Sequence, residues 1–486
     1  MTGARRWWDD AVVYQIYPRS FQDTTGSGEG DLPGITSRLD HLAWLGVDAL
    51  WLSPMYPSPR ADGGYDVADY KGVDPRYGTV ADAERLIATA HARGLRVLFD
   101  AVPCHTSIEH PWFREHPDWY VWSSVDGPAN NWRAAFGGSA WSRDEQTGRW
   151  YLHSFFPEQP DLDWRNAEVP RAFGEGLRFW LERGVDGFRV DAIDRLMKDP
   201  DLRDDPPDTA PSPLPLHPEH DELEHVHSRD APDIGTGLAQ LRASVGDALL
   251  VGEAYVPTPD LPPYLEHLDV CFGFELFHAP WDAAALRAAI DAAADVGPER
   301  VGWVLSNHDF ARLPDRVGEA NVRAAALLLL TLPGLAFIYQ GDEIGMANGP
   351  GREPPDDRYG RDPFRHPMPW DDAERHAGFT TGEPWLPVVG APDGAIAVQR
   401  ADTGSLLHLY RDLIELRRDL RGPVEVLDAD HGVVAHRRGR HVVAVNVAGE
   451  PRPAPPASRL LRHTHHVGSR PVPDMLGPGE GFLGTA

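Results

Sequence analysis

The chain has few cysteines, few positive charges and no long apolar run. Only two of its 486 residues are cysteines, Cys104 and Cys271, which excludes a disulfide framework and favours a reducing compartment. Lysine and arginine number 46 against 74 acidic residues, a net charge of −28 that disfavours nucleic-acid and anionic-membrane partners. No apolar segment reaches the ~20 residues of a membrane span, and the start of the chain lacks a signal-peptide core. We therefore expect a cytoplasmic protein that binds neither nucleic acid nor membrane.

Short apolar runs recur along the chain, with helix-like segments between them. The runs predict eight buried strands, at residues 12–18, 47–53, 95–102, 185–191, 248–254, 270–276, 301–306 and 335–340. Helical patterns lie between many of them, for example at 79–93 and 321–332. This alternation predicts an α/β fold, a parallel (β/α)₈ or TIM barrel. An open doubly wound sheet is the alternative, but no GxGxxG turn follows the first strand.

Three regions depart from the alternation. Residues 104–170 are rich in Trp, Pro and Gly, so we predict a small domain inserted after the third strand. Residues 199–232 are rich in Pro, Asp and His, which indicates a long loop over the barrel. After a helix at 405–419, residues 423–448 alternate like antiparallel strands. The predicted domains are the barrel at 1–103 and 171–421, the insert at 104–170, and a C-terminal β-domain at 422–486.

Charged residues gather where predicted strands end, which is where TIM barrels place their catalytic groups. Asp191 follows the fourth strand, Glu253 the fifth and Asp309 the seventh; Asp100 and His105 stand at the end of the third, and His308 directly precedes Asp309. One acid at a strand end is often a helix cap or an ion-pair partner, but three on different strands are hard to explain by packing. The pattern predicts either an oxygen-rich metal site or acid–base and nucleophilic chemistry on an acetal.

Glycosidic cleavage with retention needs an ionised nucleophile and an acid that stays protonated, about 5 Å apart. Arg189 precedes Asp191 by two residues and shares its face of the strand, so its charge is expected to keep Asp191 ionised. Glu253 has no such cation beside it in the sequence, which suits a raised pKa and the role of the acid.

The segments "DAVPCH", "GFRVDAID", "GEAY" and "SNHD" resemble, in order and spacing, those of the α-amylase superfamily of retaining α-glycoside hydrolases. "FGGSAW", "YLHSFFPEQPDLDW", "GRDPFRHPMPW" and "GFTTGEPWLPV" are similar to its exo-acting oligo-1,6-glucosidase and α-glucosidase branch. The resemblance runs from about residue 7 to about residue 448. It implies that Asp191 is the nucleophile and Glu253 the general acid/base. Asp309 would be the third carboxylate, which orients the sugar and favours an oxocarbenium-like transition state.

The resemblance further implies a closed sugar pocket and a small oligosaccharide substrate. By this resemblance, Arg189, His105 and His308 hold the sugar, Tyr65 stacks beneath it, and Phe155 forms an apolar wall. A pair of Asp62 and Arg361 closes the pocket, with Arg365 as the alternative arginine. In this branch a Val directly after the nucleophile accompanies α-1,6 specificity, and smaller residues accompany α-1,4 acceptance. Ala192 occupies that position, so α-1,4 linkages are expected to be preferred.

The predicted chemistry requires no cofactor, but the loop at 23–31 raises the question of a metal. Relatives carry an acidic calcium loop here, and this chain keeps Asp23 and Asp31. Thr25 and Ser27 between them are poor ligands for a hard cation, so we expect a Gly-rich turn, with calcium or magnesium as the weaker alternative. A zinc site is likewise less expected than a solvated loop for four histidines, His217, His220, His225 and His227.

Cys104 and the pair Asp194–Arg195 depart from the family pattern. Cys104 stands where the family usually has Asn, and we expect it to pack as a buried thiol rather than act as a redox switch. Asp194 and Arg195 stand where calcium-dependent amylases tend to have Lys-His, which weakens the case for their interdomain calcium.

Three functions are compatible with the resemblance to different degrees. A retaining α-glucosidase is the leading hypothesis. A glucosyl transferase or isomerase, similar to trehalose synthase or sucrose isomerase, would use the same three carboxylates. A non-catalytic protein like the heavy subunit of amino-acid transporters is disfavoured, because that class lacks the carboxylates and carries a membrane anchor.

Overall fold

The computed structural model describes residues 6–209, 212, 214–468 and 470–486, and it contains a closed barrel of eight parallel strands. The strands follow one another around the barrel in chain order: β1 (Val12–Ile16), β2 (Ala49–Leu52), β3 (Arg96–Ala101), β6 (Gly187–Val190), β7 (Leu249–Gly252), β8 (Val270–Phe272), β9 (Val301–Val304) and β10 (Leu335–Tyr339). The predicted TIM barrel is therefore confirmed. The prediction was wrong where it extended the sixth strand to residue 276, because helix α7 (Phe274–His278) begins there. A short apolar run fits a buried strand or a buried helix equally well.

Both faces of the barrel strands are buried, which explains why they are continuous apolar runs rather than alternating ones. In β1 and β2, Val13 and Trp51 point into the barrel interior, where they join a cluster that includes Leu98 and Phe337. Their neighbours, such as Tyr14, belong to the larger core between the barrel and its helices. Side chains alternate across each strand, so one run of residues supplies two cores.

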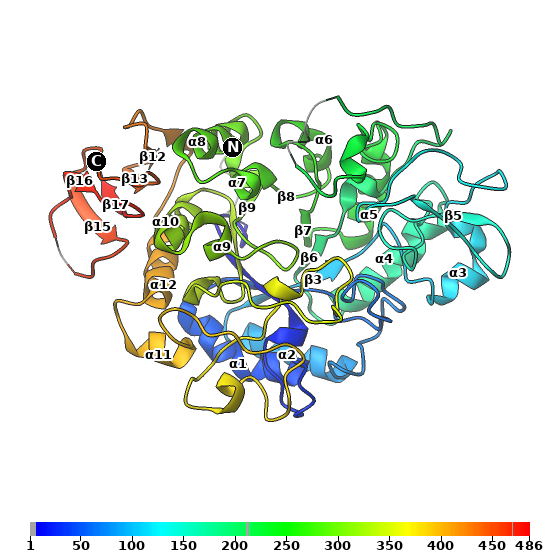
Figure 1. Cartoon of the computed structure of the whole chain (residues 1–486), viewed down its shortest axis with the longest axis horizontal. Coiled ribbons are helices and arrows are strands. Elements are labelled where there is room, and N and C mark those ends of the chain that lie inside the picture. The colour runs from blue at the N-terminus through cyan, green and yellow to red at the C-terminus, as the bar shows by residue number, and fades with distance from the viewer. Residues whose placement is uncertain (1–5, 210–211, 213, 469) are drawn as a thin grey trace.

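Helices surround the barrel (Figure 1). The longer ones are α1 (Leu32–Leu45), α2 (Val80–Ala92), α4 (Glu168–Leu181), α5 (Ile234–Val245), α8 (Ala283–Ala294), α10 (Val322–Thr331) and α12 (Leu406–Arg417); shorter ones are α6 (Pro262–Leu265), α9 (Leu313–Val317) and α11 (Ile396–Ala401). Local signals fix several ends: Thr79 and Asp82 form a capping box on α2, and α1 ends at Gly46 with a φ of 93°. No helix in the described ranges is both long and apolar enough to cross a membrane.

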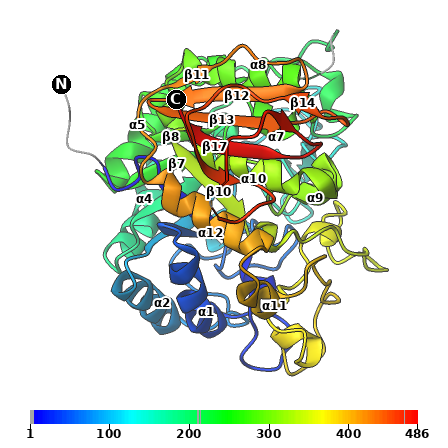
Figure 2. The ribbon, with the colours of Figure 1, turned by 90° about the vertical axis from the view of Figure 1, so that its left-hand side faces the viewer.

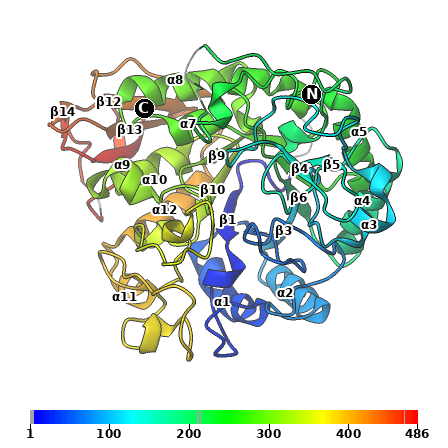
Figure 3. The ribbon, with the colours of Figure 1, turned by 45° about the vertical axis from the view of Figure 1, so that its right-hand side comes forward.

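The chain leaves the barrel between β3 and α4 and forms a small insert. It contains α3 (Pro111–Glu115) and the antiparallel pair β4 (Trp141–Arg143) and β5 (Trp150–Leu152), with a core of its own that includes Trp132 and Leu152. Figure 3 shows the insert on the side of β6. A bridge between His105 and Asp161 ties the two ends of the insert together beside the barrel.

A second sheet follows the barrel at the C-terminal end of the chain. Its antiparallel order is β11 (Val424–Val426), β12 (Val433–Arg438), β13 (His441–Asn446), β17 (Gly481–Thr485) and β15 (Arg459–His463), with a separate pair β14 (Arg452–Pro453) and β16 (Met475–Leu476). This sheet covers α8 and α10 (Figure 2). Strands β15 and β17 come from the Pro-rich tail beyond residue 450, for which the sequence predicted no elements.

Candidate active site

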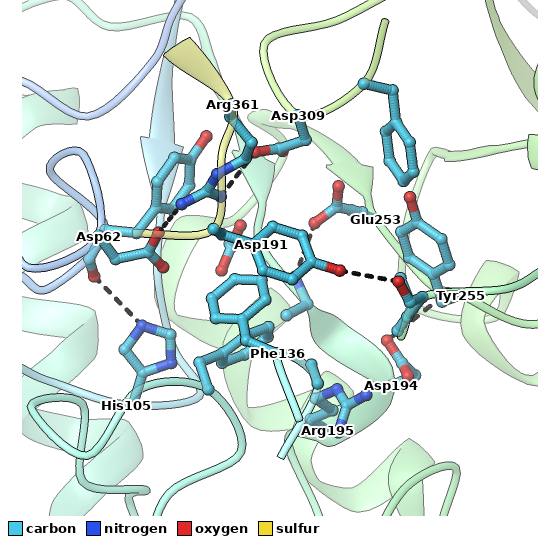
Figure 4. Close-up of a pocket in the computed structure, with 17 residues that line it drawn as sticks. Asp62, His105, Phe136, Asp191, Asp194, Arg195, Glu253, Tyr255, Asp309 and Arg361 are labelled. Carbon is cyan, nitrogen blue, oxygen red and sulfur yellow. Dashed lines mark hydrogen bonds and ion pairs between the residues drawn. The ribbon is translucent and has the colours of Figure 1, made fainter. Parts of the chain in front are cut away.

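A cavity lies at the C-terminal ends of the barrel strands (Figure 4). Both the barrel and the insert supply its walls. Predicted site residues that line it are Asp62, Tyr65, His105, Phe155, Asp191, Ala192, Glu253, Asp309 and Arg361. The structure thus brings together three carboxylates from three strand ends and contacts that lie far apart in the sequence.

Arg189 lies fully buried behind the cavity and contacts three carboxylates, two of which line the cavity. Its Nη1 is 2.6 Å from Asp191 Oδ1 and 2.9 Å from Asp100 Oδ1, and its Nη2 is 2.5 Å from Glu253 Oε1. Glu253 therefore has a cationic neighbour in space, although none stands beside it in the sequence. Sequence spacing could show only the partner on the same strand, whereas the barrel also places β7 beside β6.

One guanidinium cannot neutralise three buried carboxylates. Burial raises the pKa of Asp191, and repulsion from Glu253 and Asp100 adds to this against the opposing charge of Arg189. Burial likewise raises the pKa of Glu253, with Arg189 opposing. Both carboxyl groups therefore have raised pKa values, which runs against the expectation that Arg189 keeps Asp191 ionised and fits the expected raised pKa of Glu253.

Asp309 has the opposite environment. Burial alone would raise its pKa, but His308, Arg361 and Arg365 together hold that pKa well below its usual value. Arg361 Nη1 lies 2.9 Å from Asp309 Oδ1, and Arg365 Nη2 lies 3.2 Å from the same atom. Asp309 therefore differs from the other two carboxylates, because its cationic neighbours favour the ionised form.

Arg361 also closes one end of the cavity. Its Nη2 pairs with Asp62, as the choice of Arg361 over Arg365 anticipated, and with Asp357 Oδ1 at 2.6 Å. Asp62 Oδ2 accepts a hydrogen bond of 2.9 Å from Gln159 in the insert. Figure 4 shows Asp191 between this network and Arg195.

His308 does not line the cavity but supports it from behind. Its Nδ1 lies 2.8 Å from Gln15 Nε2, which must donate, so the ring hydrogen is on Nε2, 3.2 Å from Asp309 Oδ2. The ring is nearly parallel to Tyr65, with centroids 5.3 Å apart. Arg189 and His308 were expected to hold the sugar, but the structure places both beneath the groups that line the cavity.

Several lining residues were not predicted. Tyr255 and Phe310 directly follow the "GEA" and "SNHD" segments, so their place after a strand end was a usable signal. The others are Ala135, Phe136, Asp194, Arg195, Leu216 and Tyr359. Leu216 and Tyr359 come from long loops, where no periodic pattern marks them.

The loop at 23–31 does not fit a calcium or magnesium ion. Asp23 accepts hydrogen bonds from the backbone N–H groups of Thr25 (2.8 Å) and Gly28 (2.7 Å), and Asp31 caps α1 by accepting from Gly34 N at 2.6 Å. Donor hydrogens that converge on both carboxylates occupy the lone pairs that a cation would need and place positive partial charge there. Both aspartates therefore act as turn and cap residues in this structure.

Two of the four loop histidines are not solvated as expected, because His220 and His225 are only 1% and 4% exposed. Their rings stack with centroids 3.7 Å apart. His225 is satisfied at both nitrogens, by Ser228 Oγ at 2.8 Å and by the carbonyl of His220 at 2.7 Å. The loop folds back against the barrel mouth, and neutral, hydrogen-bonded imidazoles tolerate burial there.

Cys104 is fully buried at the base of the insert. Its Sγ donates to the carbonyl of Arg195 at 3.3 Å and lies 3.6 Å from Lys198 Nζ, which pairs with Asp161 at 2.7 Å. Burial, followed by the nearby charge of Asp161, raises the pKa of the thiol to about 12. A thiol in this state is a weak nucleophile.

Comparisons with known proteins agree with this geometry. The family model for the alpha amylase catalytic domain matches residues 15–422. A probable alpha-glucosidase of Rhizobium meliloti is 41% identical, covering 85% of this chain and 83% of that protein. An oligo-1,6-glucosidase of Parageobacillus thermoglucosidasius is 36% identical, covering 85% and 84%. The crystal structure of an alpha-glucosyl transfer enzyme, XgtA, superposes with a TM-score of 0.90 at 35% identity, covering 99% and 100%.

The fold, the carboxylates at the barrel mouth and the family match define the class. The chain belongs to the alpha-amylase family and is a glycoside hydrolase, with curated relatives named α-glucosidase and oligo-1,6-glucosidase.

Proposed function

We propose that this protein is a retaining, exo-acting α-glucosidase that releases glucose from short α-glucosides. The observation that carries the proposal is the closed end of the cavity, where Arg361 joins Asp62 and Asp309 in one buried network. A sugar that enters such a cavity meets the network with its non-reducing end. The scissile bond of the terminal residue then lies beside Asp191 and Glu253.

The arrangement of the carboxylates supports double displacement. Asp191 and Glu253 contact the two terminal nitrogens of one guanidinium, which suits the separation of about 5 Å used by retaining enzymes. Asp191 attacks the anomeric carbon, while Glu253 gives its proton to the leaving oxygen. Water then attacks the glucosyl ester, and the Glu253 carboxylate takes its proton. Asp309 stays ionised and stabilises positive charge on the sugar ring.

A second candidate is transfer of the glucosyl group to a sugar instead of water. Four aromatic side chains line the cavity and offer faces on which an acceptor sugar can pack: Phe136, Tyr255, Phe310 and Tyr359. Solved structures named as trehalulose synthase MutB superpose with TM-scores near 0.89 at 31–32% identity. This observation makes transfer or isomerisation the alternative to hydrolysis.

Product analysis decides between the two. The protein is incubated separately with maltose, isomaltose and sucrose, and early products are followed by proton NMR. With p-nitrophenyl α-glucoside, in which the glucosyl residue is the only source of glucose, we expect α-glucose as the first product, with its conversion to the β-anomer trailing behind. First appearance of β-glucose would contradict retention. Accumulation of a rearranged disaccharide, or of a lengthened saccharide with fewer than two glucose molecules released per maltose consumed, would favour the isomerase or the transferase.

A further inference from the structure

Arg195 lines the cavity at the side remote from the closed end. It follows β6 by only a few residues, and Figure 4 shows it and Arg361 on opposite sides of Asp191. Arg195 is 3% exposed, so its guanidinium has lost nearly all contact with bulk water. A buried guanidinium is costly unless partners satisfy its charge and its donors.

The protein gives Arg195 no carboxylate partner. Among the described residues it forms no ion pair, and the adjacent Asp194 faces Arg229 instead, at 3.7 Å. The only hydrogen bond of its guanidinium within the described ranges runs from Nη2 to His220 Nε2, at 2.9 Å. The donors at Nε and Nη1 therefore have no hydrogen-bonding partner in that part of the chain.

His220 is built to orient Arg195 without neutralising it. Since Nε2 accepts from an arginine, the ring hydrogen is on Nδ1, which lies 2.9 Å from Asp221 Oδ1. Burial, together with the charge of Arg195, lowers the pKa of His220 to about 2, so the ring stays neutral. His225 stacks on its face and fixes the ring plane. Residues packed behind a ligand-binding side chain commonly orient it in this way.

We propose that Arg195 determines aglycone specificity by donating hydrogen bonds to the hydroxyl oxygens of a sugar bound beyond the scissile bond. Neutral sugar hydroxyls fit better than an anion, because Asp191, Glu253 and Asp309 line the same cavity. Tyr255 offers an aromatic face beside them on which the apolar side of a sugar ring can pack. The inference rests on the proposed glucosidase activity and adds the chemistry of the leaving group.

Two substrates separate a role of Arg195 in binding the aglycone sugar from a general role in catalysis or folding. Maltose has a sugar aglycone with hydroxyl acceptors, whereas p-nitrophenyl α-glucoside has an aryl aglycone without them. In Arg195→Met we expect kcat/KM for maltose to fall roughly 10- to 100-fold, the cost of a charged hydrogen bond, and that for the aryl glucoside to change less than about threefold. Arg195→Lys keeps the charge but not the planar donor geometry and is expected to lie between the two.

Arg203→Met serves as the control, because it removes an exposed arginine that pairs with Asp199 and does not line the cavity. It is expected to leave the ratio of the two substrates unchanged. Equal losses on both substrates in Arg195→Met would overturn the inference. A wild-type preference for the anionic α-glucosylglycerate over the uncharged α-glucosylglycerol would also overturn it, because the proposal assigns Arg195 to neutral hydroxyls. The aryl glucoside reports folding and glucosidase activity by itself. A failure of the proposed function therefore appears in the wild type, and a failure of this inference appears in the variant's ratio.

Discussion

Linkage preference depends on the residue next to Asp191, and the structure gives that position two separate constraints. Ala192 lines the cavity, and its backbone N–H donates to Glu253 Oε2 at 3.1 Å. Any bulk added to its side chain therefore lies next to the bond that is cleaved. One or two methyl groups against a sugar ring are worth about 1–3 kcal/mol, or roughly 10–200-fold in kcat/KM. We expect the wild type to prefer maltose to isomaltose, and Ala192→Val to shift that ratio toward isomaltose by at least 10-fold.

The backbone adds a cost that the side chain alone does not reveal. Ala192 has a φ of 44° and a ψ of 43°, the left-handed region, which β-branched residues disfavour. Ala192→Val should therefore lose about 1–3 kcal/mol of stability as well. Ala192→Gly is the matched control, since it suits the positive φ and adds no bulk.

The assay measures kcat/KM for both disaccharides and the melting temperature of each variant. Ala192→Gly is expected to melt no lower than the wild type and to keep the preference for maltose. A higher wild-type kcat/KM for isomaltose would refute the reasoning, and so would an unchanged ratio in a folded Ala192→Val.

Three other predictions follow from the buried groups. Glu253→Gln should slow hydrolysis of maltose far more than that of an aryl glucoside with a good leaving group; equal losses would remove Glu253 from the acid role. Cys104→Asn should keep most activity, and peroxide should not reversibly inhibit the wild type; thiol-reversible inactivation that vanishes in Cys104→Ser would contradict this. Burial lowers the pKa of His308 and His436 to about 3, so only the unfolded chain takes up their protons as pH falls below about 6.5. Stability should therefore drop on acidification, by up to about 1.4 kcal/mol per pH unit for each, and melting curves of His436→Gln should show a shallower decline.

The sequence by itself determined the barrel, because strands buried on both faces appear as apolar runs whatever surrounds them. Val13 and Tyr14 illustrate this, since they serve two different cores within one run. The sequence also placed Asp191, Glu253 and Asp309 at strand ends, and closure of the barrel makes such ends converge. It predicted less well where a run is short, as at residues 270–276, or where the chain has no period, as beyond residue 450.

The tertiary structure alone decided what each charge faces. The sequence linked Arg189 to Asp191, two residues away, but did not show its contact with Glu253, 64 positions along the chain, which forms because parallel pairing brings β7 beside β6. The sequence predicted that His220 belongs to a solvated loop, whereas the fold places it in hydrogen-bonding contact with Arg195. Electrostatic interactions depend on distance and burial, and neither can be read from sequence spacing once the chain folds back on itself.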